Sequence, residues 1–233
     1  MMMHDSRSRR LRPVVALCAL ALTACSSESA GPPEDRLCKV PAGSPEEKSL
    51  HTVLRADTFR TDWHQPRDAR FVEKVEENLR NLADPAAMYT VTGCSYVPKG
   101  QVGIGRATID FEWVPLDAAK KDPAYKRKDP ADKEPRTYRL NGATGVSNDV
   151  FTSLYVSCLL PGELKESSKR VLLRTNAAFT VNLGPVHDHG TQDQQMDFVY
   201  RMTRKATEVL GCENKPLEKD PAVKPVASQG SAS

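Results

Sequence analysis

The residues of this 233-residue chain that could do chemistry are six cysteines and one histidine cluster, VHDHG at residues 186–190. Residues i and i+2 of an extended segment project to one side, so His187 and His189 could bind a metal ion. His51 or His64 could supply a third ligand. The alternative is a polar loop before a helix, where an acidic side chain interacts favourably with the helix dipole. We favour the loop and predict no metal and no cofactor, while the metal-binding interpretation stays open.

The six cysteines lie at very different places in the chain. Two are near the N-terminus, Cys18 inside an apolar run and Cys25 directly after it. The other four are separated by 56, 64 and 54 residues and include no CxxC pair, which argues against a compact zinc site. These four are Cys38, Cys94, Cys158 and Cys212.

The N-terminal segment has the pattern of an export signal. Residues 1–12 carry four arginines and one acid, and residues 13–24 (PVVALCALALTA) carry no charge. A positive segment followed by about 7–15 apolar residues is typical of a secretory signal. As a helix, the apolar run would span about 18 Å, well short of the bilayer hydrocarbon core of about 30 Å. We therefore predict that residues 1–24 are a signal peptide and not a permanent membrane span.

The end of the signal is more specific. Leu22-Thr23-Ala24-Cys25 resembles the lipobox of bacterial lipoproteins, in which a leucine and two small residues precede a cysteine. The resemblance implies cleavage before Cys25 and a diacylglyceryl group on Cys25 Sγ, with palmitate as the expected acyl chain. Two acyl chains anchor a protein more firmly than one. The resemblance thus implies a chain anchored by lipid in the cell membrane on its extracytoplasmic side; the alternative is a plain secretory signal.

The charge balance changes once the signal is removed. Four of the 33 basic residues and one of the 30 acidic residues lie in residues 1–24, which leaves 29 of each. The formal charge of +3 therefore belongs to the signal. A balanced mature chain gives no compositional reason to expect a nucleic-acid partner.

The four remaining cysteines predict two disulfides, because an even number of cysteines in an exported chain is typical of disulfides. Four cysteines allow three pairings, and the sequence does not choose among them. Our hypothesis is Cys38–Cys94 and Cys158–Cys212. The second bond would clamp the last helix against the sheet.

The mature chain is predicted to contain one globular domain. Residues 25–44 are small, polar or Pro/Gly residues and predict a flexible tether, and residues 213–233 predict a disordered tail. The domain then covers residues 45–212, an ordinary size for a single domain.

Periodicity predicts the secondary structure of this domain. Helices are expected from Ser44-Pro45, over 68–83 and from Thr191, each with an apolar stripe at helical spacing. Period-two patterns predict strands over 88–97, from 107 to 113, over 150–160 and over 171–183. Residues 117–139 predict a long exposed loop, and residues 63–66 a simple connection between the first two helices. The predicted fold class is α+β, with a four- or five-stranded antiparallel sheet, helices covering one face and two disulfides.

The sequence contains no recognisable catalytic motif. Residues 145–149 (GVSND) lack the second glycine of a nucleophile elbow, and there is neither a P-loop nor a dinucleotide-binding turn. We therefore expect a non-enzymatic binding or structural domain of the bacterial cell envelope, held at the membrane through Cys25. Its expected partner is an envelope protein or a cell-wall component. The alternative is a metal-binding lipoprotein or metal-dependent hydrolase that uses His187 and His189.

Overall fold

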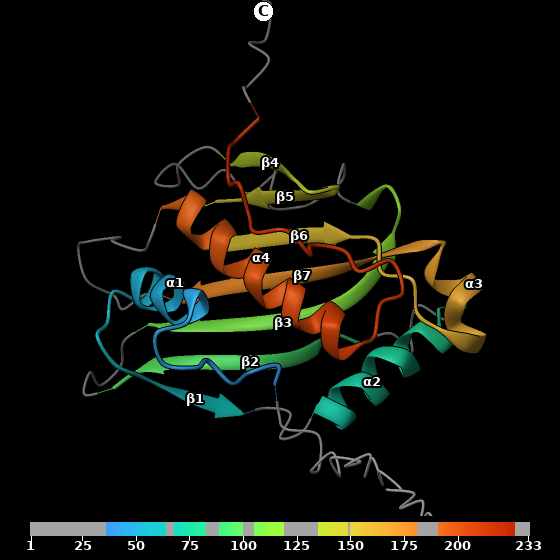
Figure 1. Ribbon diagram of the computed structural model, residues 1–233, viewed down its shortest axis with the longest axis horizontal. Coiled ribbons are helices and arrows are strands. Elements are labelled where there is room, and N and C mark those ends of the chain that lie inside the picture. The colour runs from blue at the N-terminus through green and yellow to red at the C-terminus, as the bar shows by residue number, and fades with distance from the viewer. Residues whose placement is uncertain are drawn as a thin grey trace, which may run out of the picture. The chain divides into compact units, whose positions relative to one another are not determined.

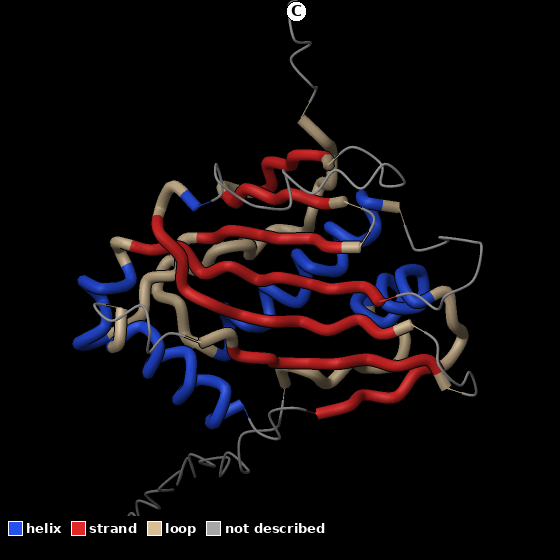
Figure 2. Tube along the Cα trace, turned by 180° about the vertical axis from the view of Figure 1, so that it is seen from behind, coloured by secondary structure: helices blue, strands red, loops and turns tan. Residues whose placement is uncertain are grey.

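The computed structural model describes residues 36–63, 68–82, 89–99, 105–118, 135–148, 150–180 and 191–226. All of them belong to one compact unit, Pro32–Ser233. The unit is α+β, with a single antiparallel sheet and helices on one of its faces (Figures 1 and 2).

The sheet has seven strands in the order β1-β2-β3-β7-β6-β5-β4, and every neighbouring pair is antiparallel. The strands are β1 (Phe59–Trp63), β2 (Val91–Pro98), β3 (Arg106–Pro115), β4 (Arg136–Leu140), β5 (Ala143–Ser147), β6 (Phe151–Val156) and β7 (Val171–Thr180). The two longest strands, β3 and β7, pair at the centre over ten residues each.

The core lies between the sheet and the helices. Strand β3 alternates as its sequence predicts, with Ile109, Phe111 and Trp113 buried and the residues between them partly exposed. The Trp113 indole donates to the Val75 carbonyl of α2 over 2.8 Å. The sheet face turned away from the helices carries polar side chains at its centre, where Arg174 of β7 donates to Glu112 of β3.

Three longer helices cover the apolar face. These are α1 (Pro45–Leu54), α2 (Asp68–Arg80) and α4 (Gln192–Val209), and a short turn, η4 (Gly162–Leu164), continues into α3 (Lys165–Ser168). Helix α4 runs across the sheet and packs against α1, β5, β6 and β7 (Figure 1). It comes so close to β5 that a Cβ added to Gly145 would lie 2.6 Å from Met196 Cε.

Helices α1 and α4 begin at the capping residues that the sequence predicts. The Ser44 side chain caps α1 by accepting from the Glu47 N–H over 3.1 Å. At α4, Thr191 and Gln194 form a complete capping box. Gly211 adopts φ 68°, a conformation that glycine takes at little steric cost, just beyond the end of α4.

Both predicted disulfides are present. Cys38–Cys94 has a Cα–Cα distance of 5.4 Å and Cys158–Cys212 one of 5.2 Å. Cys94 lies in β2, and Cys212 follows α4, so the second bond ties the end of that helix to the chain beyond β6.

The prediction of four or five strands was wrong, because three short strands were missed. Strand β1 lies mostly before the expected connection over 63–66 and shares only Trp63 with it, and its five residues are too few to show a clear period. Strands β4 and β5 form a hairpin joined by Asn141-Gly142, whose φ angles are 47° and 85°. An Asn-Gly dipeptide is a strong hairpin signal. Strand β4 was nevertheless missed, because the charged stretch over 117–139, which contains most of this strand, was assigned to an exposed loop.

The packed domain extends beyond both expected boundaries, 45 and 212. Leu37 and Cys38, expected in the tether, are 2% and 1% exposed. At the other end, Leu217 is 2% exposed and the Val226 N–H donates to the Thr137 carbonyl of β4 over 2.8 Å. Each segment contains a disulfide-bonded cysteine or begins beside one, Cys38 and Cys212, which holds that part of the chain at the core.

None of the described helices combines the length and the apolar composition that a membrane span requires.

The capping box of α4 gives a stability prediction. Replacing Thr191 with alanine removes an acceptor for the free N–H groups of the first turn, and we expect the free energy of unfolding to fall by about 1 kcal/mol. Thr52→Ala in α1 is the control and should change it by less than about 0.5 kcal/mol. Urea unfolding followed by circular dichroism measures both. Equal losses in the two variants would contradict the role of the cap.

Candidate functional site

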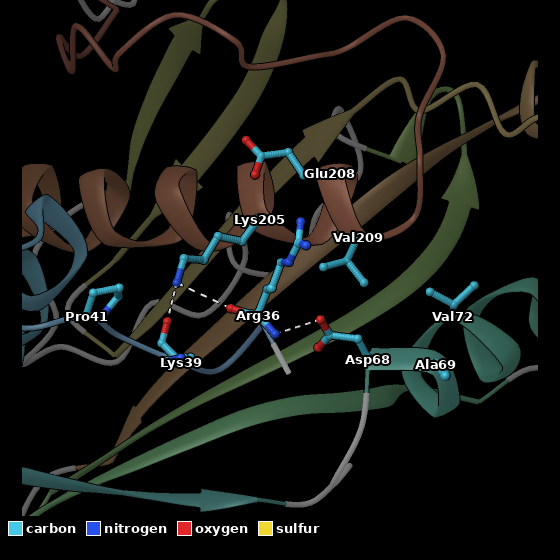
Figure 3. Close-up of a pocket in the computed structure, with 9 residues that line it drawn as sticks. All are labelled: Arg36, Lys39, Pro41, Asp68, Ala69, Val72, Lys205, Glu208 and Val209. Carbon is cyan, nitrogen blue, oxygen red and sulfur yellow. Dashed lines mark hydrogen bonds between the residues drawn. The ribbon is translucent and has the colours of Figure 1, made fainter. Parts of the chain in front are cut away.

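The main candidate site is a cavity of about 630 Å³ between α2, the C-terminal part of α4 and the segment that enters the domain from the N-terminus. We call it the tether-side cavity, because residues 25–35 connect it to the expected lipidation site. Ligand pockets usually measure about 300–1,000 Å³. Its lining residues are Arg36, Lys39, Pro41, Asp68, Ala69, Val72, Lys205, Glu208 and Val209 (Figure 3).

The entering segment is held to α2 by one carboxylate. Asp68, the first residue of α2, accepts from the backbone N–H of Arg36 over 2.7 Å and of Leu37 over 3.1 Å. A carboxylate at this position also interacts favourably with the N-terminus of its helix. The next residue, Cys38, is bonded to Cys94 in β2, so this wall is fixed both by hydrogen bonds and covalently.

Lys205 holds the same segment to α4. Its Nζ donates to the carbonyl of Lys39 and lies 3.5 Å from the carbonyl of Arg36 (Figure 3). Burial lowers the pKa of the Lys205 ammonium, although nearby carboxylates, Glu46 first among them, oppose the shift. The cavity wall therefore contains a cation that is only partly hydrated.

The lining combines apolar and charged groups in a way that suits an amphipathic ligand. Val72 of α2 and Val209 of α4 lie on opposite sides of the cavity, with Pro41 on the entering segment (Figure 3). The Arg36 side chain extends from that segment toward α4. Ligand pockets typically pair apolar walls with a few polar groups that fix orientation. Binding is thus the chemistry that this arrangement supports.

The structure places only some of the residues singled out in the sequence. Cys25, His64, His187 and His189 lie outside the described residues, so lipidation and metal binding stay predictions. His51 is in α1, where its Nδ1 contacts the Ala56 carbonyl at 2.5 Å. The described ranges contain no group of three His, Cys, Asp or Glu side chains that could hold a metal ion.

The tether-side cavity is not among the sites that the sequence predicts. Its walls come from three parts of the chain that are far apart, and the charged residues among them look like ordinary surface residues in the sequence. One signal was available in Cys38, since a disulfide to a buried strand must bring its neighbours Arg36 and Lys39 onto the domain.

Comparison with known proteins does not extend this description. The chain matches no protein-family model, no curated protein and no solved structure.

The carboxylate of Asp68 gives a testable prediction about the cavity wall. Asp68→Ala removes the acceptor of two backbone N–H groups, and bonds to charged groups contribute about 1.5–3 kcal/mol when partly shielded from water. We expect the free energy of unfolding to fall by about 1.5 kcal/mol and amide exchange at Arg36 and Leu37 to become faster. Asp57→Ala, at an exposed position, is the matched control. Unchanged exchange at both amides would show that Asp68 does not hold the segment.

Proposed function

We propose that the protein is a lipid-anchored extracytoplasmic domain of the bacterial cell envelope that binds an envelope component in the tether-side cavity. The single observation that carries the proposal is the position of that cavity. Arg36 lines it, and Arg36 is the first described residue of the chain that leads from the expected lipidated Cys25.

The two disulfides support the extracytoplasmic part of the proposal. Disulfides form and persist in oxidising compartments and are rare in the cytosol. Both bonds join cysteines more than 50 residues apart in sequence and fix opposite ends of the folded chain, Cys38 at the N-terminal side and Cys212 at the C-terminal side.

The length of the connecting chain supports a membrane-proximal role. Ten residues lie between Cys25 and Arg36, so the two are eleven Cα–Cα steps apart. At about 3.3–3.6 Å per residue, they reach at most about 40 Å. An anchored domain would thus keep the tether-side cavity close to the membrane surface, within reach of amphipathic envelope molecules.

The lining supports a class of ligand. Three basic residues, Arg36, Lys39 and Lys205, line the cavity against two acidic ones, Asp68 and Glu208, and Lys205 already donates to backbone carbonyls. Val72 and Val209 supply apolar contacts. An anionic amphiphile would match both features. Asp68 already accepts from two backbone N–H groups, so its charge is partly compensated inside the wall.

The anchor is tested by fatty-acid labelling in a bacterial host. Cys25→Ser removes the thiol that would carry the lipid, so we expect the label and membrane retention to be lost. Cys18→Ser is the matched control, because Cys18 lies in the part of the signal that cleavage removes. In-gel detection of an alkynyl palmitate measures the label. A label that survives in Cys25→Ser would refute lipidation at this residue.

The ligand site is tested with anilinonaphthalene sulfonate, an anionic amphiphile whose fluorescence rises on binding. Val72→Trp places a large ring at the cavity wall, and we expect the affinity to fall about tenfold, equivalent to about 1.4 kcal/mol. Leu116→Trp adds the same ring at a position that is 58% exposed and should leave the affinity unchanged. Saturable binding that is equal in both variants would place the dye outside the tether-side cavity.

A further inference from the structure

The two edges of the sheet differ in whether another described segment pairs with them. At the β4 edge, Pro225 forms a bridge with Tyr138, and the Val226 N–H donates to the Thr137 carbonyl over 2.8 Å. At the other edge, no described segment pairs with the outer side of β1, which is the lowest strand in Figure 2. An open edge strand is a template for pairing with another chain.

The register of β1 on β2 determines which backbone groups point outward. The Lys99 N–H donates to the Thr58 carbonyl over 3.0 Å, so these residues form a hydrogen-bonded pair. Such pairs alternate along antiparallel strands, and Arg60 and Asp62 therefore bond to β2. The N–H and C=O groups of the three residues between and beside them point away from the sheet. These residues are Phe59, Thr61 and Trp63.

The sequence of β1, FRTDW, is complementary to itself when two copies run antiparallel. With a two-fold axis at Thr61, Thr61 faces Thr61 of a second copy and Arg60 faces Asp62. The three outward residues of each copy then supply three donors and three acceptors, enough for six hydrogen bonds. Opposite charges directly across a strand pair are favourable.

The charges also select this register. Arg60 is accessible, with 62% of its side chain exposed, and Asp62 lies 3.7 Å from its guanidinium and 3.3 Å from that of Arg106. A shift by two residues in either direction keeps the backbone pairing pattern but places Arg60 opposite Arg60, or Asp62 opposite Asp62. Like charges directly opposite are unfavourable.

We propose that the β1 edge binds the β1 edge of a second copy of this chain, with the two-fold axis at Thr61. The two seven-stranded sheets then form one continuous antiparallel sheet. The pairing rests on the proposed lipid anchor, because a five-residue strand gives a small interface compared with the usual 1,600 Å² or so. Confinement to one membrane raises the effective concentration of the two edges.

Cysteine crosslinking of the full chain in membranes tests the pairing. In a hydrogen-bonded pair the Cα atoms lie about 5.5 Å apart, within the disulfide range of about 4.4–6.8 Å. Thr61→Cys should thus give a disulfide-linked dimer under mild oxidation. Arg60→Cys is the matched control, because each Arg60 faces Asp62 and the two introduced cysteines are out of register. We expect at least fivefold more dimer from Thr61→Cys.

The outcomes separate this proposal from the anchor. Equal crosslinking of the two variants, or no dimer from Thr61→Cys while the fatty-acid label is retained, overturns the pairing. A chain without the label overturns the anchor alone. The same comparison on the concentrated unlipidated chain then decides the pairing, which is overturned if Thr61→Cys gives no excess of dimer.

A charge exchange provides an independent readout in the Thr61→Cys background. Arg60→Asp puts two acids opposite each other, and Asp62→Arg puts two bases there, so either change alone should reduce the dimer at least threefold. A chain with Arg60→Asp and a chain with Asp62→Arg are complementary, so co-expression should restore a mixed dimer. Arg139→Asp, an exposed position on β4, controls for the change in net charge. Failure of co-expression to restore the dimer would overturn the proposed register.

Discussion

The pairing of β3 with β7 is the interaction on which the rest of the structure depends. Ten consecutive residue pairs join these strands, from Arg106↔Thr180 to Pro115↔Val171. They connect an N-terminal group, β1-β2-β3, to a C-terminal group, β7-β6-β5-β4. Both strands turn large apolar side chains toward the helices, including Phe111, Trp113 and Phe179, so the pairing also creates the surface on which α2 and α4 pack.

The disulfides reinforce each group separately. Cys38–Cys94 fixes the entering segment to β2, and Cys158–Cys212 fixes the end of α4 to the chain after β6. Neither bond crosses the β3–β7 junction, which therefore depends on hydrogen bonds and apolar packing. A disulfide that closes a loop of this length typically contributes about 2–4 kcal/mol. The first bond also gives the tether-side cavity a fixed wall.

The elements that the sequence predicts best are those for which one local signal decides the structure. The alternation from 107 to 113 identified β3, and Thr191 with Gln194 identified the start of α4. The disulfide hypothesis was confirmed for both bonds, although the sequence alone left three pairings open. Strand β1 was missed because its five residues pair only after β2 provides an edge.

The candidate site was harder to predict for a related reason. The tether-side cavity exists because Asp68 and Lys205 hold a segment from the N-terminus between α2 and α4. Nothing in a single sequence window shows that these residues meet, since the contacts of Asp68 and Lys205 with this segment span 31 to 169 positions. For Cys25 and for the pair His187 and His189, a local motif supports a prediction. These residues lie outside the described ranges, so the structure does not test it.

We propose a lipid-anchored extracytoplasmic domain held by two disulfides. The intact mass of the protein, extracted from the membrane of a bacterial host, tests both parts in one measurement. We predict a chain that begins at Cys25, carries the added mass of a diacylglyceryl group and gains four hydrogens on reduction. A chain that retains residues 1–24, lacks the lipid mass or gains no hydrogens on reduction would contradict the account.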